Sequence, residues 1–84
     1  MLTIKVLGPG CPNCYKVEEI TKASLSTMGM DAQIEKITDY NEIVEYGVLS
    51  TPGLMINGRV VCSGQIPSQA EVTSWLEDAA MEAG

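Results

Sequence analysis

The sequence predicts an α/β fold whose elements follow the order β-α-β-α-β-β-α. The prediction depends on three observations: a β-rich first segment that stops at a Gly-Pro-Gly breaker, a long helical periodicity directly after it, and a late Asn-Gly turn between two apolar runs. A helix joins the first two strands, so these should be parallel with a right-handed crossover, whereas the hairpin strands must be antiparallel. We therefore expect a four-stranded mixed sheet with helices on both faces.

The first half of the chain alternates strands and helices. Residues 2–7 are β-rich and end at the breaker of residues 8–10. Over residues 12–28 the periodicity predicts a helix, and Gly29 is a natural residue to follow its end. The residues expected on the buried face of this helix are Val17, Ile20, Thr21, Ser24, Leu25 and Met28. Residues 32–37 are expected to form the second strand.

Two capping boxes predict the starts of the two later helices. Asp39 with Glu42 opens a short helix that runs to Tyr46, and Ser68 with Glu71 opens the final helix. The final helix is expected to bury Val72, Trp75, Leu76, Ala79 and Ala80.

An Asn-Gly turn at residues 57–58 predicts a hairpin, because these residues tolerate the positive φ angles of a type I′ turn. A two-residue turn would pair Leu54 with Val61 and Gly53 with Cys62. We expect Cys62 to be a half-buried packing residue. A second redox thiol or a dimerising thiol is the alternative.

Composition excludes several classes of function. The 84 residues are expected to form a single domain, residues 1–84, and they contain no histidine, which excludes imidazole catalysis. The net charge of −6, from eleven acidic and five basic residues, would repel nucleic acids and anionic membranes. No apolar run approaches the roughly 20 residues of a membrane span, and residues 1–5 show no secretion signal. We therefore expect a cytoplasmic monomer that binds neither nucleic acid nor membrane.

Two of the three cysteines form the motif Cys11-Pro12-Asn13-Cys14, and the third, Cys62, lies far along the chain. In a reducing compartment a lone CxxC indicates redox chemistry or metal binding rather than a structural disulfide. Cys11 is expected at or near the N-cap of the first helix, where N–H groups and the helix dipole stabilise a thiolate. Such sites lower a cysteine pKa from about 8.5 to roughly 3.5–7.5. A Cys11 thiolate can then attack a disulfide, and Cys14, one helical turn away, can resolve the mixed disulfide.

Together these motifs resemble the thioredoxin-fold family, and the likeness spans the whole chain. The segments that carry it are Gly8-Pro9-Gly10-Cys11, Thr51-Pro52-Gly53-Leu54 and Gly64-Gln65-Ile66-Pro67-Ser68. Within that family the sequence is most similar to the small, glutaredoxin-sized prokaryotic proteins called redox-active disulfide proteins. The resemblance implies a thioredoxin-like fold and a thiol–disulfide oxidoreductase of electron transport, with Cys11 as nucleophile and Cys14 as resolving thiol.

A substrate groove is also implied by the resemblance. In the family the Thr-Pro bond before the third strand is cis and the proline packs beside the CxxC pair, so the Thr51–Pro52 bond should be cis. Thr51, Pro52, Pro12 and Asn13 would line the groove, and the backbone of Thr51 would pair with an incoming extended chain. The implied substrates are protein disulfides, and the implied electron donor is a thioredoxin-reductase-like flavoprotein. No cofactor or metal is implied beyond the redox-active disulfide itself.

The chain departs from larger thioredoxins at two positions. Gly10 stands where they have Trp, and Lys5 stands where they have a buried Asp that helps to deprotonate the resolving thiol. The proton of Cys14 must therefore pass to water or to another group, or its transfer must be slower.

A soft-metal chaperone that binds copper through the CxxC pair is the alternative function. Such ferredoxin-like domains also place a CxxC between the first strand and the first helix. However, their order is β-α-β-β-α-β, and they usually have Met two residues before the first cysteine, where this chain has Pro9. A zinc site is weaker still, since the cysteines leave four-fold coordination incomplete without histidine. The intact CxxC argues against a non-catalytic binding module.

Overall fold

The computed structural model describes residues 2–10 and 12–83, with side chains through residue 81. The elements in chain order are β1 (Leu2–Leu7), α1 (Pro12–Met28), β2 (Ala32–Ile37), α2 (Tyr40–Glu45), β3 (Gly53–Ile56), β4 (Arg59–Ser63) and α3 (Gln69–Ala83). This is the order that the sequence predicts. Among the described residues, no helix is both long and apolar enough to span a membrane.

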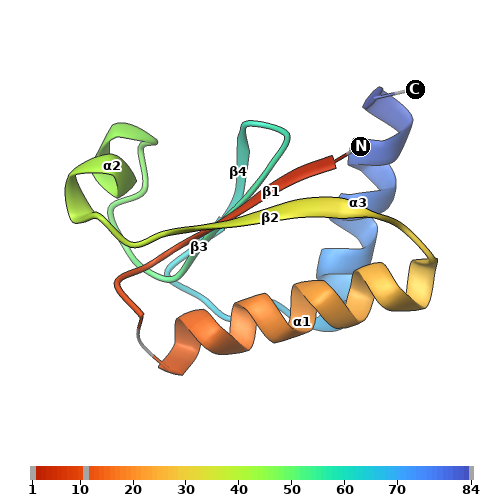
Figure 1. The fold of residues 1–84 in the computed structure, drawn as a ribbon, viewed down its shortest axis with the longest axis horizontal. Helices are drawn as coiled ribbons and strands as arrows, with labels where there is room; N and C mark the ends of the chain where they lie inside the picture. The colour runs from red at the N-terminus through yellow and green to blue at the C-terminus, as the bar shows by residue number, and fades with distance from the viewer. Residues whose placement is uncertain (1, 11, 84) are drawn as a thin grey trace.

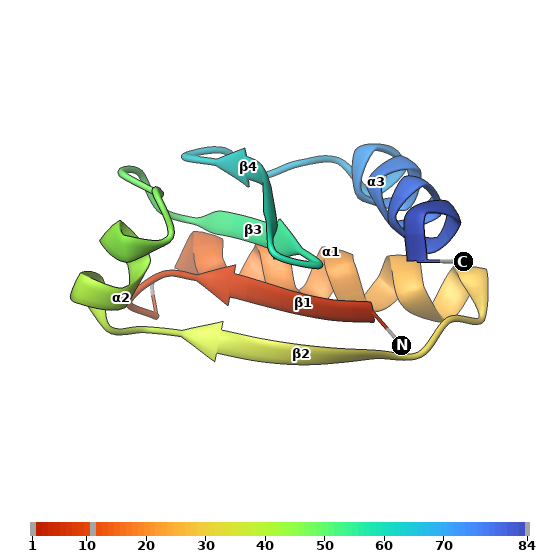
Figure 2. The same cartoon turned by 90° about the horizontal axis from the view of Figure 1, so that it is seen from above.

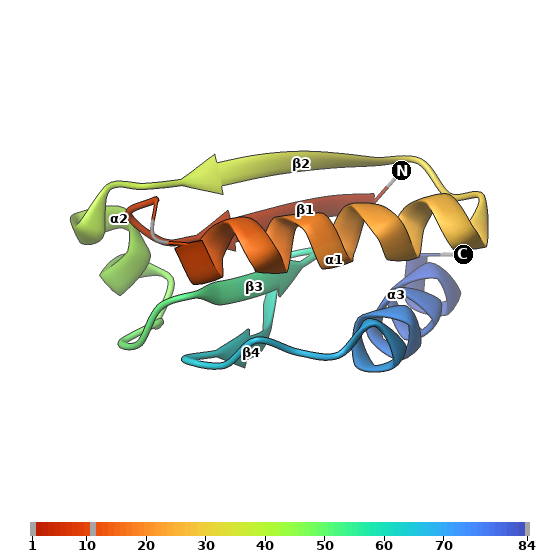
Figure 3. The same cartoon turned by 90° about the horizontal axis from the view of Figure 1, so that it is seen from below.

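The four strands form one mixed sheet in the order β2-β1-β3-β4, which Figure 2 shows from above. β1 runs parallel to β2 and antiparallel to β3, and β3 runs antiparallel to β4. α1 and α3 lie together on one face of the sheet (Figure 3). The short α2 lies on the opposite face, at the end where β1 stops (Figure 1). The prediction of a four-stranded mixed sheet with helices on both faces is confirmed.

Each face of the sheet has its own hydrophobic cluster. The larger cluster lies under α1 and α3 and contains Leu2, Ile4, Val6, Val17, Leu25, Leu54, Ile56, Val72, Leu76 and Ala79. The smaller cluster lies under α2 and contains Leu7, Ile43, Val48 and Met55. Because side chains alternate along a strand, β1 sends Ile4 and Val6 to the first cluster and Leu7 to the second.

The two predicted helix starts are capped by side chains. At α3, Ser68 Oγ accepts from the Glu71 N–H at 3.1 Å, and the Glu71 carboxylate accepts from the Ser68 N–H at 3.1 Å. This is the reciprocal pattern of a capping box. At α2, the Asp39 carboxylate accepts from the N–H of Asn41 at 2.9 Å. Asp39 is therefore the N-cap of α2, as the sequence predicts. Its side chain accepts from the N–H of Asn41, however, and not from that of Glu42 as in a capping box.

The hairpin turn also agrees with the sequence. Asn57 and Gly58 have φ angles of 51° and 80°, as a type I′ turn requires. The turn is tied back to β1, because the Asn57 side chain accepts from the Thr3 N–H at 3.0 Å and the Asn57 N–H donates to the Thr3 carbonyl at 2.8 Å.

The predicted pairing beyond the turn is wrong. A bulge between Leu54 and Met55 shifts the register, so Leu54 pairs with Cys62 rather than Val61, and Gly53 pairs with Ser63 rather than Cys62. The extra residue allows the consecutive side chains of Val61 and Cys62 both to pack against the larger cluster. A strict alternation would have sent one of them to the opposite face.

Candidate functional site

The candidate residues lie where β1 ends and α1 begins. Cys11, the predicted nucleophile, lies outside the described residues. Pro12 is the first residue of α1, and both Pro12 and Asn13 are exposed. Cys14 lies in the same first turn but is buried, with 6% of its surface exposed. Proline suits the start of a helix because its missing N–H would have no intrahelical partner there.

Gly8 allows Cys14 to occupy its buried position. A Cβ atom on Gly8 would overlap Cys14 Sγ and would lie 3.9 Å from Thr51 Cβ. The Gly8 N–H donates to the Ile37 carbonyl at 2.8 Å, which holds this backbone beside the end of β2. The sulfur of Cys14 therefore packs against a bare backbone, with Thr51 close by.

Thr51 and Pro52 approach the same place from the loop before β3. The Thr51–Pro52 peptide bond is cis, which is the isomer that the resemblance implies. Thr51 is half-buried and Pro52 is buried. The Pro52 carbonyl accepts from the Gly64 N–H at 2.8 Å, so the loop after β4 fixes this segment. The structure thus brings Cys14 and Thr51 together around Gly8, whereas Pro12 and Asn13 point outward from the turn.

A small cleft of about 50 Å³ opens beside Cys14. Its lining residues are Val6, Gly8, Gly10, Cys14, Tyr15, Glu18, Lys36 and Thr38. Glu18 and Lys36 were missed by sequence reasoning. Glu18 follows Cys14 by four residues, so the helical periodicity could have placed it on the same face.

Glu18 is a buried carboxylate held by two lysines. Its side chain is 11% exposed, and its two oxygens lie 3.1 Å from Lys36 Nζ and 3.3 Å from Lys22 Nζ. Burial alone would raise the pKa of Glu18, but the hydrogen-bonded ammonium groups of Lys36 and Lys22 outweigh it and hold this pKa below its ordinary value. Lys36 Nζ also lies 5.3 Å from the centre of the Tyr15 ring, a cation–π distance.

Cys62 lies in a different environment. It is half-buried in β4, and its Sγ–H donates to the Gln65 carbonyl at 3.5 Å. Burial, together with the negative charge of Glu71, raises the pKa of this thiol. A raised pKa suppresses the thiolate, so Cys62 is a poor nucleophile at neutral pH.

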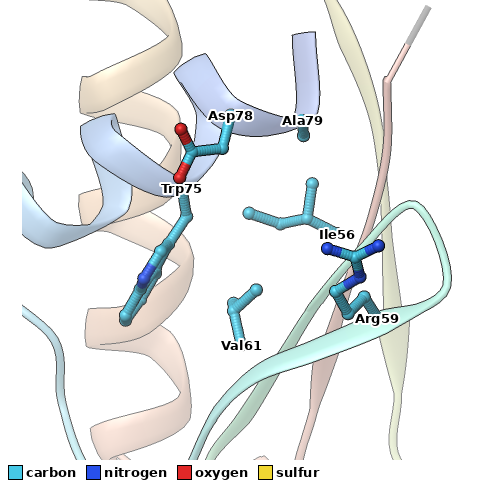
Figure 4. A pocket seen from close by; sticks show the side chains of 6 residues that line it. All are labelled: Ile56, Arg59, Val61, Trp75, Asp78 and Ala79. Carbon is cyan, nitrogen blue, oxygen red and sulfur yellow. The ribbon is translucent and has the colours of Figure 1, made fainter. Parts of the chain in front are cut away.

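A larger hollow lies between α3 and the hairpin. It has a volume of about 220 Å³ and is lined by Ile56, Arg59, Val61, Trp75, Asp78 and Ala79 (Figure 4). None of these side chains is a nucleophile for disulfide exchange. Of these two hollows, the smaller cleft is the one that a cysteine, Cys14, lines.

No cluster of three or more metal-ligating side chains occurs in the part of the chain that the structure describes. What the described residues do assemble is a parallel β-α-β unit, a buried cysteine in the first turn of α1, a cis proline nearby and a C-terminal hairpin and helix. This arrangement defines the class of thiol–disulfide oxidoreductases that the sequence resembles.

Comparison with known proteins agrees with this class. A family profile described as "Thioredoxin domain" matches residues 2–77. The thioredoxin of Methanocaldococcus jannaschii is 40% identical over 77 residues, which cover 92% of this chain and 88% of that protein. The thioredoxin of Methanothermobacter thermautotrophicus is 33% identical over 76 residues, which cover 90% of this chain and 99% of that protein. The chain belongs to the thioredoxin family and is a thiol–disulfide oxidoreductase.

Proposed function

We propose that the chain reduces disulfides through the Cys11-Pro12-Asn13-Cys14 pair. The thiolate of Cys11 attacks one sulfur of the substrate disulfide and expels the other as a thiolate, which leaves a mixed disulfide. Cys14 then loses its proton and attacks the Cys11 sulfur, so the second substrate thiolate leaves and a Cys11–Cys14 disulfide forms. Two electrons pass from the dithiol to the substrate, and solvent protonates the two substrate thiolates.

The observation that carries this proposal is the difference in exposure within the first turn of α1. Cys14 is buried against Gly8, whereas its neighbours Pro12 and Asn13 are exposed. A buried thiol cannot reach a bulky external disulfide, but it can reach a sulfur one helical turn away in its own chain. This difference supports a division of labour between an attacking Cys11 and a resolving Cys14.

The substrates are proposed to be protein disulfides. Thr51, Pro52, Pro12 and Asn13 would form the groove, and the backbone of Thr51 would pair with the extended substrate chain. Since the Pro52 carbonyl already accepts from Gly64, Thr51 is the residue with backbone groups to offer. A thioredoxin-reductase-like flavoprotein would return the electrons in a reducing cytoplasm. The chain would act as a monomer and without a cofactor.

Three serine variants test the proposal. We expect Cys11→Ser to abolish the reduction of insulin disulfides, because the nucleophile is lost. Cys14→Ser should accumulate a mixed disulfide with the substrate, visible as an adduct by mass spectrometry. Cys62→Ser is the matched control, since this half-buried thiol lies outside the CxxC motif, and it should retain full turnover.

Full activity in Cys11→Ser would refute the assignment of the nucleophile. A redox titration of the wild type should reveal one two-electron couple that Cys14→Ser lacks. If the wild type shows no reversible disulfide and instead forms a tight 1:1 complex with Cu(I), the copper-chaperone alternative is correct.

A further inference from the structure

A buried carboxylate shares the cleft with the resolving thiol. Glu18 and Cys14 are four residues apart on α1, so they project from the same side of the helix, and both line the cleft. The volume of about 50 Å³ is enough for a water molecule, which needs roughly 10–15 Å³ of free space for its centre. Polar partners for that water are present in Glu18, Lys36 and Thr38.

The charges around Glu18 keep its carboxylate ionised. Lys22 of α1 and Lys36 of β2 contact its oxygens, and Tyr15 and Cys14 of α1 line the same cleft. The charged residue of β1, Lys5, points to the opposite face of the sheet, where its Nζ donates to Tyr46 Oη at 2.9 Å. An ionised carboxylate has about four lone-pair positions, so the two lysine contacts leave room for a further hydrogen bond.

Cys14 must lose its proton before its sulfur can attack Cys11, and Glu18 is a carboxylate that lines the same cleft. We propose that Glu18 is the acceptor of this proton, and that it takes the proton from the Cys14 thiol through a water molecule in the cleft. This inference rests on the proposed function. As the S–H bond of Cys14 breaks, the proton moves to the water and a water proton moves to a Glu18 oxygen. The Cys14 sulfur then attacks Cys11, and the electron pair of the Cys11–substrate bond leaves with the substrate thiolate. Glu18 afterwards returns its proton to solvent.

Lys36 is a positioning residue in this arrangement. Its ammonium contacts one Glu18 oxygen and the face of the Tyr15 ring, so it fixes the carboxylate at the wall of the cleft. It also favours the ionised carboxylate, which keeps the acceptor available at lower pH. Removal of this charge should therefore move the pH at which the acceptor becomes protonated upward.

The resolving step can be observed directly with dithiobis-nitrobenzoate, whose leaving group is coloured. In a Cys62→Ser background, attack by Cys11 releases the first coloured thiolate in a phase that depends on reagent concentration. Attack by Cys14 releases the second in a first-order phase that does not. We expect Glu18→Gln to slow the second phase at pH 7 by about tenfold or more, since a positioned acid–base group is worth roughly 10²–10⁴-fold and water replaces part of it. The first phase should change less than about twofold.

The pH profile separates proton transfer from a structural role. With Glu18 present, the second phase should be nearly independent of pH across neutrality, whereas in Glu18→Gln it should rise about tenfold per pH unit because hydroxide supplies the base. Lys36→Met should shift the acid limb of the profile upward. Glu19→Gln is the matched control, since it removes the same charge from an exposed neighbour, and it should leave both phases unchanged.

Two outcomes would overturn the proposal. If Glu18→Gln matches Glu19→Gln in rate and pH profile, Glu18 accepts no proton. If Glu18→Gln accelerates the second phase, the carboxylate acts only as a charge that repels the thiolate. Failure of the proposed function would look different: the Glu18-containing parent would release one coloured thiolate without a first-order second phase.

Discussion

The two faces of the sheet carry hydrophobic clusters of different size. Among the described residues, the cluster that α1 and α3 form with one face of the sheet contains ten buried side chains, and the buried thiol and carboxylate belong to this side. On the other face α2 covers four buried side chains at the end of β1, and Lys5 lies beside them with its ammonium 4.6 Å from the centre of the Tyr46 ring. A small domain buries a smaller share of its surface than a large one, so its core is limited.

This difference bears on the proposed function. In that proposal Cys14 needs a rigid support in order to stay buried, and α1 supplies it because Val17, Thr21 and Leu25 are buried along the same face of the helix. A buried carboxyl group on this face stays ionised only when it is paired with a cation, and Glu18 is paired with two lysines. The shallow face leaves Lys5 more open to water, and it takes part in neither step of the proposed exchange.

The largest expected effect comes from a matched pair of isoleucines. Ile4 and Ile43 are both fully buried, but Ile4 belongs to the large cluster and Ile43 to the small one. Ile→Ala substitutions in cores cost about 2–5 kcal/mol, and the cost rises with the cavity that remains. We expect Ile4→Ala to lower the free energy of unfolding by about 4 kcal/mol and Ile43→Ala by about 2, because α2 can collapse onto its cluster. Urea unfolding measures the free energy of unfolding of both variants. Equal losses would mean that the two clusters do not differ in how far they can close the cavity.

A pair of glycines compares the faces at the site itself. A Cβ on Gly8 would overlap Cys14 Sγ, whereas a Cβ on Gly53 would meet a Val48 methyl group at 3.0 Å on the α2 side. Gly8→Ala must therefore displace the thiol, at a cost of about 1–3 kcal/mol. Gly53→Ala should cost less than about 1 kcal/mol, since Val48 can give way by a few tenths of an ångström.

The two glycine variants should also differ in chemistry. Gly8→Ala should slow the first-order release of the second coloured thiolate, because the sulfur of Cys14 moves. Gly53→Ala should leave that rate unchanged. An unchanged rate in Gly8→Ala would show that the position of Cys14 does not depend on the bare backbone at residue 8.

Local signals explain how much of the fold the sequence predicts. The bounds of β1, α1 and β2 agree with the prediction because a breaker at residues 8–10 and a glycine at residue 29 mark them within the chain. The bulge at Val61 was missed, since it depends on packing against distant helices rather than on the turn. Glu18 was missed for a similar reason: its carboxylate is paired with Lys36, which comes from β2 and lies far along the chain.

The smallest expected effects concern how the stability of the fold depends on pH. Glu18 on one face of the sheet should act in acid, and Lys5 on the other face should act in alkali. The pKa of Glu18 is held below its ordinary value of 4.5, so its ion pairs stabilise the fold fully above that pH, and the stabilisation is lost as the pH falls through the lowered pKa. The hydrogen bond from Lys5 to Tyr46 raises the pKa of Lys5 above its ordinary value of 10.5. Its contribution is therefore complete below that pH and is lost as the pH rises through the raised pKa.

Unfolding free energies across the pH range test both signs. Relative to wild type, Glu18→Gln should be less stable at pH 7 by about 1 kcal/mol or less, and the difference should vanish in acid. Lys5→Met should differ from wild type by an amount that stays constant from acid to neutral pH and changes only in alkali. A Glu18→Gln deficit that persisted at low pH would mean that the side chain stabilises by packing alone. The charge of the Glu18 carboxylate, to which we assign proton transfer, would then contribute nothing to the stability of the face that α1 and α3 cover.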